Sequence, residues 1–173
     1  KDRSTNAVVS DFDITNNMVL PFLDRHSWFS FLKPKNLERK ATVSISELGI
    51  VCQSELDLVT TLSGGNQQKV MIGRWLSEKS EVLLLDEPFQ GVDIKARRDI
   101  GSQIRQSSKD RATLVFVAEL DEAVEIADKI VVLHEGSYAG IFENKESNIV
   151  DILSLYSGKP LEALAEARGS LNG

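Results

Sequence analysis

The chain has 173 residues, of which 42% are hydrophobic and 27% charged, and its formal net charge is −6. This composition is ordinary for a globular protein with one domain, or with one domain and a smaller subdomain. The negative charge argues against a dominant nucleic-acid surface. No apolar run reaches about 18 residues, so the sequence predicts no membrane-spanning helix.

The single cysteine, Cys52, cannot form an internal disulfide, and the sequence shows no signal-peptide pattern. Both features favour a reducing compartment. Because the sequence begins at Lys1 without a methionine, we expect it to be a piece of a longer protein.

Residues 1–16 are mostly polar and are predicted to form a loop. Asn16 or Asn17 is expected to cap a helix that runs through Leu23, with Pro21 tolerable only in its first turn. A second helix is predicted from Asn36 to about Leu48, ended by Gly49. Its inward side chains are predicted to be Val43, Ile45 and Leu48.

The most aromatic stretch of the sequence is Trp28–Leu32. One interpretation is a local helical core. The other is a docking patch for a partner, since exposed apolar clusters mark interfaces.

A third helix is predicted to open at Ser63-Gly64-Gly65 and to bury a face made of Val70, Met71, Ile72, Trp75 and Leu76. Met71 and Trp75 are interpreted as packing residues. The free N–H groups and the positive dipole end at the start of a helix favour an anion there.

The continuous apolar run Val82–Leu85 predicts a strand of a parallel sheet covered on both faces. It ends in two carboxylates, Asp86 and Glu87, which suit a hydrated Mg²⁺ ion and an activated water. The alternative for Asp86 is a strand-end carboxylate that caps the following turn.

The rest of the sequence alternates further helices and strands. Asp93 is predicted to cap a helix through Ile104, and Thr113–Val117 to pair in parallel with the first strand through a right-handed crossover. The remaining predicted elements are a helix at 120–127, strands at 130–133 and 137–142, and a last helix capped by Asn144. The last helix is expected to bury Ile149, Ile152, Leu153 and Tyr156 and to end at Gly158 and Pro160.

Three motifs in this order resemble the ATP-binding-cassette (ABC) ATPases. Leu62–Lys69 is similar to their signature motif, Val82–Glu87 to their Walker B strand, and Gly91–Asp93 to their D-loop; Asp86 follows Ser63 by 23 residues. The Asn66-Gln67-Gln68-Lys69 ending resembles the second cassette of duplicated sugar-importer ATPases of the ribose, galactose, arabinose and autoinducer-2 type.

The resemblance implies an α/β fold, namely part of a P-loop NTPase core with a mainly parallel sheet plus an α-helical subdomain, without the phosphate-loop part. We expect three divisions: residues 1–80 as the helical subdomain with the signature helix, 81–143 as the C-terminal half of the ATPase core, and 144–173 as a C-terminal helix and tail.

The resemblance also implies roles for single residues. Ser63, Gly64, Gly65 and Gln67 would bind nucleotide, mainly the γ-phosphate of an ATP held by the opposing cassette. Asp86 would hold Mg²⁺ through water, Glu87 would be the catalytic residue that polarises the attacking water, and Asp93 would connect the two sites.

Two departures from the family pattern stand beside these matches. No Gly-x-x-x-x-Gly-Lys-Ser/Thr phosphate loop occurs, since Gly158-Lys159 is preceded by Leu153 at the position of the first glycine. The chain alone is therefore predicted not to hydrolyse ATP. Ala118 stands where most cassettes place a histidine, so the site completed by Asp86 and Glu87 is predicted to be weak or silent. The histidines present, His26 and His134, are predicted to be surface or strand-end residues.

The implied cofactors in the complete protein are ATP and Mg²⁺. The implied partners are the other ATP-binding cassette, transmembrane permease subunits and, indirectly, a sugar-binding protein, at the cytoplasmic face of the membrane; no nucleic acid is expected. Two alternatives stay open: a non-transport cassette ATPase acting on ribosomes or DNA, and a non-catalytic binding module.

Overall fold

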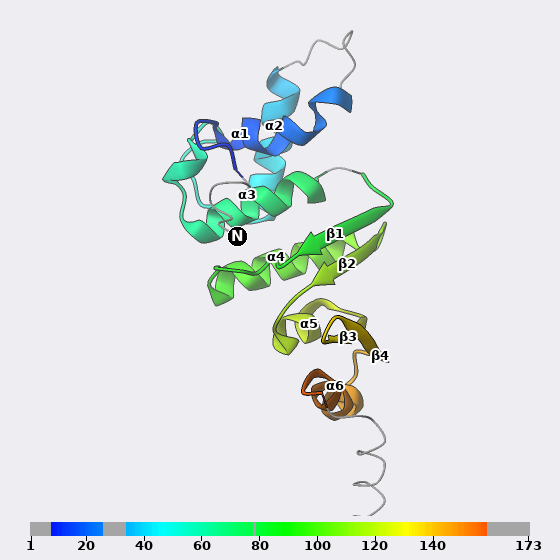
Figure 1. Ribbon diagram of the computed structural model, residues 1–173. Helices are drawn as coiled ribbons and strands as arrows, with labels where there is room; N and C mark the ends of the chain where they lie inside the picture. The colour runs from blue at the N-terminus through cyan, green and yellow to red at the C-terminus, as the bar shows by residue number, and fades with distance from the viewer. Residues whose placement is uncertain (1–7, 26–33, 78, 159–173) are drawn as a thin grey trace, which may run out of the picture. The chain divides into compact units, whose positions relative to one another are not determined.

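The computed structural model describes residues 8–25, 34–77 and 79–158 of the chain (Figure 1). The chain separates into two compact units, residues 1–117 and residues 118–173, and each unit is described by itself. No helix within the described residues is long and apolar enough to cross a membrane. The predicted three divisions at residues 80 and 143 stay a prediction.

The first unit combines helices with a two-stranded sheet. Strands β1 and β2 are parallel, with Val82 opposite Ala112 and Asp86 opposite Phe116, and α4 connects them (Figure 1). The predicted α/β class with a parallel strand pair is confirmed. The elements in chain order are α1 (Ile14–Val19), the 3₁₀ helix η1 (Leu20–Arg25), α2 (Pro34–Glu47), the 3₁₀ turn η2 (Val59–Thr61), α3 (Gly64–Leu76), β1 (Val82–Asp86), α4 (Ile94–Ser107) and β2 (Ala112–Phe116).

The helical core of this unit lies where α1, α2 and α3 pack together. Its fully buried members include Ile14 on α1, Ala41 on α2 and Val70 on α3, all at most 1% exposed. Leu62, directly before the predicted signature serine, belongs to the same core. Burial of this apolar cluster fixes the helix that carries the signature motif.

The start of α1 differs from the prediction. The cap is Asp13, whose carboxylate accepts the N–H of Asn16 at 2.6 Å, and the helix begins at Ile14. Asn17 was predicted as a possible cap, but it lies inside the helix and is fully buried. Its side-chain oxygen accepts the N–H of Val9 at 2.8 Å, and its amide donates to the carbonyl oxygens of Val9 and Phe12. Asn17 therefore holds the preceding loop rather than the helix end.

The predicted inward face of α2 is wrong at Val43, whose side chain is 49% exposed. The buried stripe is Ala41, Ser44 and Leu48, at the three- and four-residue spacing of a helix face. The chain leaves the helix at Gly49, as predicted, because that residue has a φ of +57° that favours glycine.

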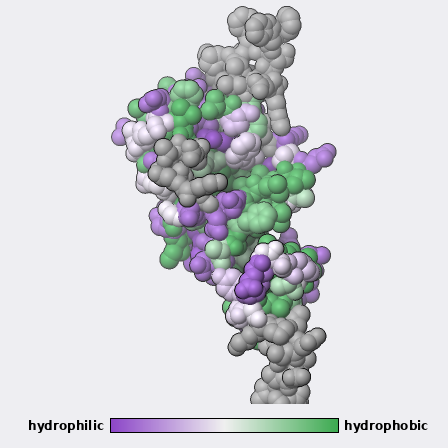
Figure 2. Space-filling model, in the orientation of Figure 1, coloured by the Kyte–Doolittle hydropathy of each residue, from purple (hydrophilic) through white to green (hydrophobic). Residues whose placement is uncertain are grey.

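Only one face of β1 is covered, contrary to the prediction of two covered faces. Leu83 and Leu85 are buried, whereas Val82 and Leu84 are 58% and 65% exposed. Their neighbours on β2, Leu114 and Phe116, are exposed as well, so this face of the sheet is apolar and open. Part of it is visible as a green area over β1 in Figure 2. A continuous apolar run in the sequence does not show which face of the strand other parts of the fold will cover.

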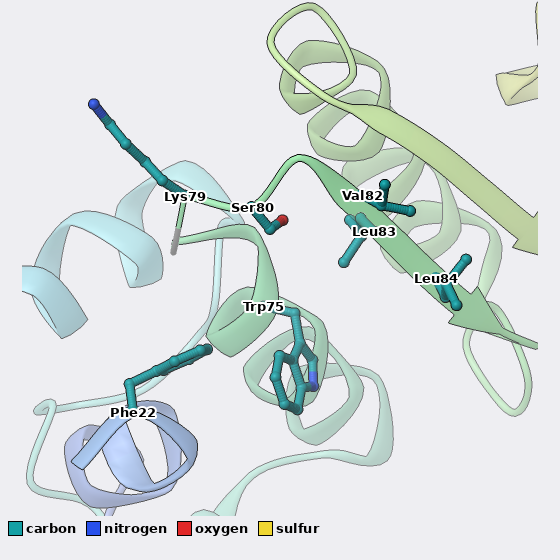
Figure 3. A pocket seen from close by; sticks show the side chains of 7 residues that line it. All are labelled: Phe22, Trp75, Lys79, Ser80, Val82, Leu83 and Leu84. Atoms are coloured by element: carbon teal, nitrogen blue, oxygen red, sulfur yellow. The ribbon is translucent and has the colours of Figure 1, made fainter. Parts of the chain in front are cut away.

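Beside this open sheet face lies a hollow of about 340 Å³ (Figure 3). Its aromatic side is Phe22 packed edge-to-face against Trp75, with ring centroids 5.3 Å apart. Trp75 is 45% exposed, so the prediction that it lies on the buried face of α3 is wrong. The other lining residues are Lys79, Ser80, Val82, Leu83 and Leu84, none of which is a predicted nucleotide-binding residue.

The second unit is a β-hairpin packed against a helix. Strands β3 (Lys129–His134) and β4 (Ser137–Glu143) are antiparallel and are joined by Glu135-Gly136, both with positive φ, as a tight hairpin turn requires. The flanking elements are α5 (Leu120–Ile126), the 3₁₀ turn η3 (Glu146–Asn148) and α6 (Ile149–Tyr156). The core is built from Ile130, Val132, Ile152 and Leu155.

The predicted cap of the last helix is wrong. Asn144 donates its side-chain amide to the carbonyl oxygens of Val124 and Ala127 at 2.8 and 2.7 Å, so it ties the end of β4 to the end of α5. Helix α6 starts only at Ile149. Leu153 and Tyr156 are 47% and 53% exposed, and Leu155 is the residue that packs with Ile152 against Ile130 and Val132 of β3.

His134 is the last residue of β3, which confirms its prediction as a strand-end residue. His26 and the aromatic stretch 28–32 lie outside the described residues, so both interpretations of that stretch stay open.

The buried amide of Asn17 makes a testable contribution to stability. We expect Asn17→Ala to lower the free energy of unfolding by about 2–3 kcal/mol, because the backbone groups of Val9, Phe12 and Asp13 lose their hydrogen bonds to the buried side chain of Asn17. Urea unfolding followed by circular dichroism measures this. The matched control is Asn16→Ala on the exposed side of the same helix, whose side-chain amide donates to the carboxylate of Asp13 at 2.8 Å. An equal loss in both variants would contradict the role given to Asn17.

Candidate functional site

Ser63 is the N-cap of α3. Its hydroxyl oxygen accepts the backbone N–H of Asn66 at 3.4 Å and the side-chain amide of Asn66 at 3.1 Å. The backbone of Ser63 is extended (φ −61°, ψ 156°), and its carbonyl oxygen accepts the first helical N–H from Gln67 at 2.9 Å. Ser63 is also exposed.

The two glycines that follow differ in their surroundings. A Cβ on Gly64 would meet nothing within 4 Å, whereas a Cβ on Gly65 would lie 3.3 Å from that of Ala96 on α4. Gly65 therefore allows α3 to approach α4 closely. The N–H groups of both glycines belong to the first turn of a 13-residue helix, where no intrahelical acceptor exists. They are available to an anion placed at the open side of Gly64.

Two glutamines of α3 donate side-chain hydrogen bonds to backbone carbonyl groups near the helix. Gln67 donates its side-chain amide to the carbonyl oxygen of Leu62 at 2.9 Å, which closes the turn around Ser63. Gln68 donates to the carbonyl oxygen of Pro88 at 2.8 Å. The second bond joins the signature helix to the turn directly after β1. The sequence predicted that Gln67 binds nucleotide. In the structure the side-chain amide of Gln67 is bonded to the backbone carbonyl oxygen of Leu62.

Asp86 and Glu87 lie at the end of β1, as predicted. Asp86 is exposed and pairs in register with Phe116. Glu87 has a φ of +48°, an uncommon value for a residue with a side chain, and its N–H donates to the carbonyl oxygen of Phe116 at 2.9 Å. The two carboxylates therefore follow each other across a sharp change of backbone direction at the strand end.

Asp93 is the N-cap of α4, as predicted. Its carboxylate accepts the N–H of Ala96 at 2.8 Å, and its backbone is extended. Gly91 precedes it with a φ of +72°, which turns the chain between the strand and the helix.

Sequence reasoning missed the residue that holds these parts together. Lys69 is only 4% exposed, and its ammonium donates to the carboxylate of Asp99 on α4 at 2.7 Å and to the carbonyl oxygen of Gly49 at 3.0 Å. Lys69 stands in the recognised motif, but nothing in the local sequence points to Asp99, which lies 30 residues further along.

Ala118 lies at the start of the second unit and is exposed. Its carbonyl oxygen accepts the hydroxyl of Tyr156 at 3.2 Å, which ties the segment before α5 to the end of α6. The methyl side chain offers neither a hydrogen bond nor a charge.

The titratable groups near the helical core do not supply a nucleophile. Burial raises the pKa of the Cys52 thiol, and the carboxylates of Asp57 and Glu55 raise it further, so the thiol is protonated at neutral pH. Burial lowers the pKa of Arg74, whose guanidinium lies 3.5 Å from the side-chain oxygen of Asn17.

The start of α3 suits a phosphate, and the carboxylates after β1 suit a magnesium ion. The start of α3 offers a hydroxyl and two backbone N–H groups, with no acidic residue in its first turn, which suits an anion. Within the described residues no three His, Cys, Asp or Glu side chains form a metal-binding group. Asp86 and Glu87 suit an ion that keeps its waters and is bound by one or two carboxylates together with phosphate, which is the habit of Mg²⁺.

Residues 4–90 match the sequence profile of the ABC transporter family, which is half of the chain. The chain belongs to the ABC transporter family. It is 36% identical over 160 residues to the ribose import ATP-binding protein RbsA of Bacillus cereus, and 35% identical over 157 residues to the galactose/methyl galactoside import ATP-binding protein MglA of Fusobacterium nucleatum. These matches cover 91% and 90% of this chain but only 32% and 31% of the relatives, so the chain spans about a third of their length.

Solved ABC cassettes share the fold. The dimeric structure of MJ0796, a bacterial ABC transporter cassette, superposes with a TM-score of 0.70 at 18% identity, covering 83% of this chain and 61% of that one. The cassette MJ0796 bound to ADP and Pi gives a TM-score of 0.69, covering 80% of this chain and 59% of that one. The fold class predicted from the three ABC motifs is confirmed.

Substituting alanine for the two exposed glycines of the ABC motifs, Gly64 and Gly91, is expected to change the free energy of unfolding in opposite directions. Gly64→Ala fills open space in a helical first turn and is expected to raise the free energy of unfolding by about 0.5–1 kcal/mol. Gly91→Ala also meets nothing within 4 Å, but at a φ of +72° it is expected to cost about 1–2 kcal/mol. Urea titrations of both variants test this, and a loss of stability in Gly64→Ala would contradict the open helix start.

Proposed function

We propose that this chain is part of the ATP-binding subunit of an ABC importer for sugars, and that it supplies signature and Walker B residues to composite ATP sites that drive transport. One observation carries the proposal. A helix start with an open, neutral cap at Ser63 is bonded through Gln68 to the turn that follows a strand ending in Asp86 and Glu87. The likeness to ribose and galactose import ATP-binding proteins over about nine tenths of the chain supports the substrate class.

The proposed role of the α3 start is to bind the γ-phosphate of an ATP held mainly by the opposing cassette. The hydroxyl of Ser63 donates one hydrogen bond, and the N–H of Gly65 donates a second. The open space at Gly64 lets the phosphate approach the backbone, and the helix dipole favours its charge. Because these donors are held before the ATP arrives, they stabilise the charge that develops during phosphoryl transfer.

The proposed role of the strand end is to orient a magnesium ion and a water molecule. Mg²⁺, when bound with ATP, neutralises the phosphate charge as γ-phosphoryl transfer proceeds. Asp86 would accept hydrogen bonds from waters of that ion, and Glu87 would orient and polarise the attacking water by accepting a hydrogen bond from it. Asp93, at the start of α4, connects this site with the one across the cassette dimer.

Two features support an unequal pair of composite sites in the complete protein. The residue at the switch position is Ala118, which has no side-chain donor for the γ-phosphate. The signature residues Ser63, Gly64 and Gly65 keep all their donors. We therefore assign Ser63 to the active site of the other cassette and Asp86 and Glu87 to a weak or silent site.

The proposed partners are the other ATP-binding cassette and the transmembrane permease subunits, with a sugar-binding protein acting indirectly. The proposed place of action is the cytoplasmic face of the membrane, where ATP is available. The relatives' names support the ATP-binding and import roles. The sugar itself is set by the permease and the binding protein.

The unequal sites predict an order of mutational effects in the complete ATP-binding subunit. Ser63→Arg, which blocks the phosphate with a bulky side chain, is expected to lower the turnover of ATP about 100-fold. Glu87→Gln is expected to change it far less, because its site contributes little. Phosphate release from the subunit assembled with its permease measures both.

The control for the added arginine is Ser102→Arg, at an exposed position of α4 away from both helix starts. It is expected to retain the parent turnover. A larger effect of Glu87→Gln than of Ser63→Arg would overturn the assignment of the two sites.

The chain of 173 residues is also expected not to hydrolyse ATP by itself, because it contains no Gly-x-x-x-x-Gly-Lys-Ser/Thr loop to hold the β- and γ-phosphates. Phosphate release by the purified chain with Mg-ATP measures this. Appreciable turnover that Glu87→Gln abolishes would contradict the prediction.

A further inference from the structure

The ammonium of Lys69 is a buried charge that the proposed chemistry does not use. The side chain is 5% exposed, and its Nζ atom lies 2.7 Å from Oδ2 of Asp99 and 3.0 Å from the carbonyl oxygen of Gly49. Its contacts therefore reach three elements: α3, which carries it, α4, which carries Asp99, and the end of α2 at Gly49.

Two of these elements, α3 and α4, carry the two proposed functional helix starts. Lys69 lies in the second turn of α3, whose cap is Ser63, and Asp99 lies in the second turn of α4, whose cap is Asp93. One turn nearer the caps, Gly65 faces Ala96 so closely that a Cβ added at Gly65 would lie 3.3 Å from the Cβ of Ala96. The ion pair and this close contact are two successive points along one helix–helix seam.

Stability alone does not account for a charge at this place. Taking the ammonium of Lys69 out of water costs much of what its attraction to Asp99 returns, and the side chain of Asp99 is itself 34% exposed. Apolar residues of similar size can fill such a site without that cost. The ion pair also constrains geometry, which an apolar contact would not do. The ammonium of Lys69 must lie at hydrogen-bond distance from both the carboxylate of Asp99 and the carbonyl oxygen of Gly49.

We propose that Lys69 and Asp99 are a positioning pair that fixes the signature start of α3 against the D-loop start of α4. Ser63 and Asp93 are thereby held at one separation when the cassettes close on ATP. The proposal rests on the proposed function of these two caps, and Lys69 and Asp99 themselves touch no substrate.

The test uses the complete ATP-binding subunit assembled with its permease. Lys69→Met and Asp99→Asn are each expected to lower kcat for ATP about 10- to 100-fold, because small misplacements of binding groups have effects of this size. The KM for ATP is expected to stay near the parent value, because the phosphate loop that holds the nucleotide belongs to other residues. Lys95→Met, an exposed lysine in the first turn of α4, is the matched control and is expected to behave as the parent.

A double variant separates positioning from folding. Lys69→Met/Asp99→Leu leaves no unpaired buried charge, so its thermal midpoint is expected to recover toward that of the parent. Its kcat is expected to stay low, because the directed contacts to α4 and Gly49 are still missing. Recovery of kcat together with the midpoint would overturn the proposal.

Hydrogen exchange of the same variants gives a readout that does not depend on ATP turnover. Lys69→Met is expected to speed exchange at peptides that contain the first turns of α3 and α4, whereas Lys95→Met is not. Unchanged exchange there overturns the positioning pair. If Ser63→Arg leaves turnover intact while exchange responds to Lys69→Met, the proposed function of Ser63 fails and the positioning pair stands.

Discussion

The close packing of α3 on α4 is the constraint on which the candidate site depends. It favours glycine at position 65, since a Cβ there would lie 3.3 Å from that of Ala96, a tight contact. The Lys69–Asp99 ion pair continues the seam one turn further, and the bond from Gln68 to Pro88 joins α3 to the end of β1. Two helix starts and a strand end are thus brought into one part of the first unit.

The two helix starts are capped in different ways, and the difference gives them different chemistry. Asp93 places a full negative charge on the start of α4 with a 2.8 Å bond to Ala96, so that helix neutralises its own dipole. Ser63 is neutral and reaches Asn66 only at 3.4 Å, so the dipole of α3 is left for an external anion. A charged cap at position 63 would repel phosphate. In the proposed function, the neutral serine therefore favours α3 over α4 as the helix that binds the anion.

The sequence predicted several features that depend on neighbouring residues, although the cap of α1 is Asp13 rather than Asn16 or Asn17. The caps at Ser63 and Asp93, the stop at Gly49 and the order of strands and helices follow from local rules and are confirmed. Other predictions failed because they concern residues whose partners lie far away in the sequence. Asn144 bonds carbonyl groups 17 and 20 residues away, and Lys69 pairs with Asp99 across 30 residues, so only the folded chain brings these partners together. The wrong burial of Val82 has the same cause, because a neighbour from elsewhere decides which face of a strand is covered.

Glu87 shows how this packing reaches the carboxylate of the Walker B strand. A φ of +48° is costly for a glutamate, and the proline that follows restricts the same backbone further. The conformation is held from both sides: its N–H bonds Phe116 on β2 at 2.9 Å, and the carbonyl oxygen of Pro88 accepts Gln68 from α3 at 2.8 Å. When several contacts hold a strained residue, its backbone conformation is fixed. The direction of the backbone at Glu87 is therefore fixed by its contacts with β2 and α3.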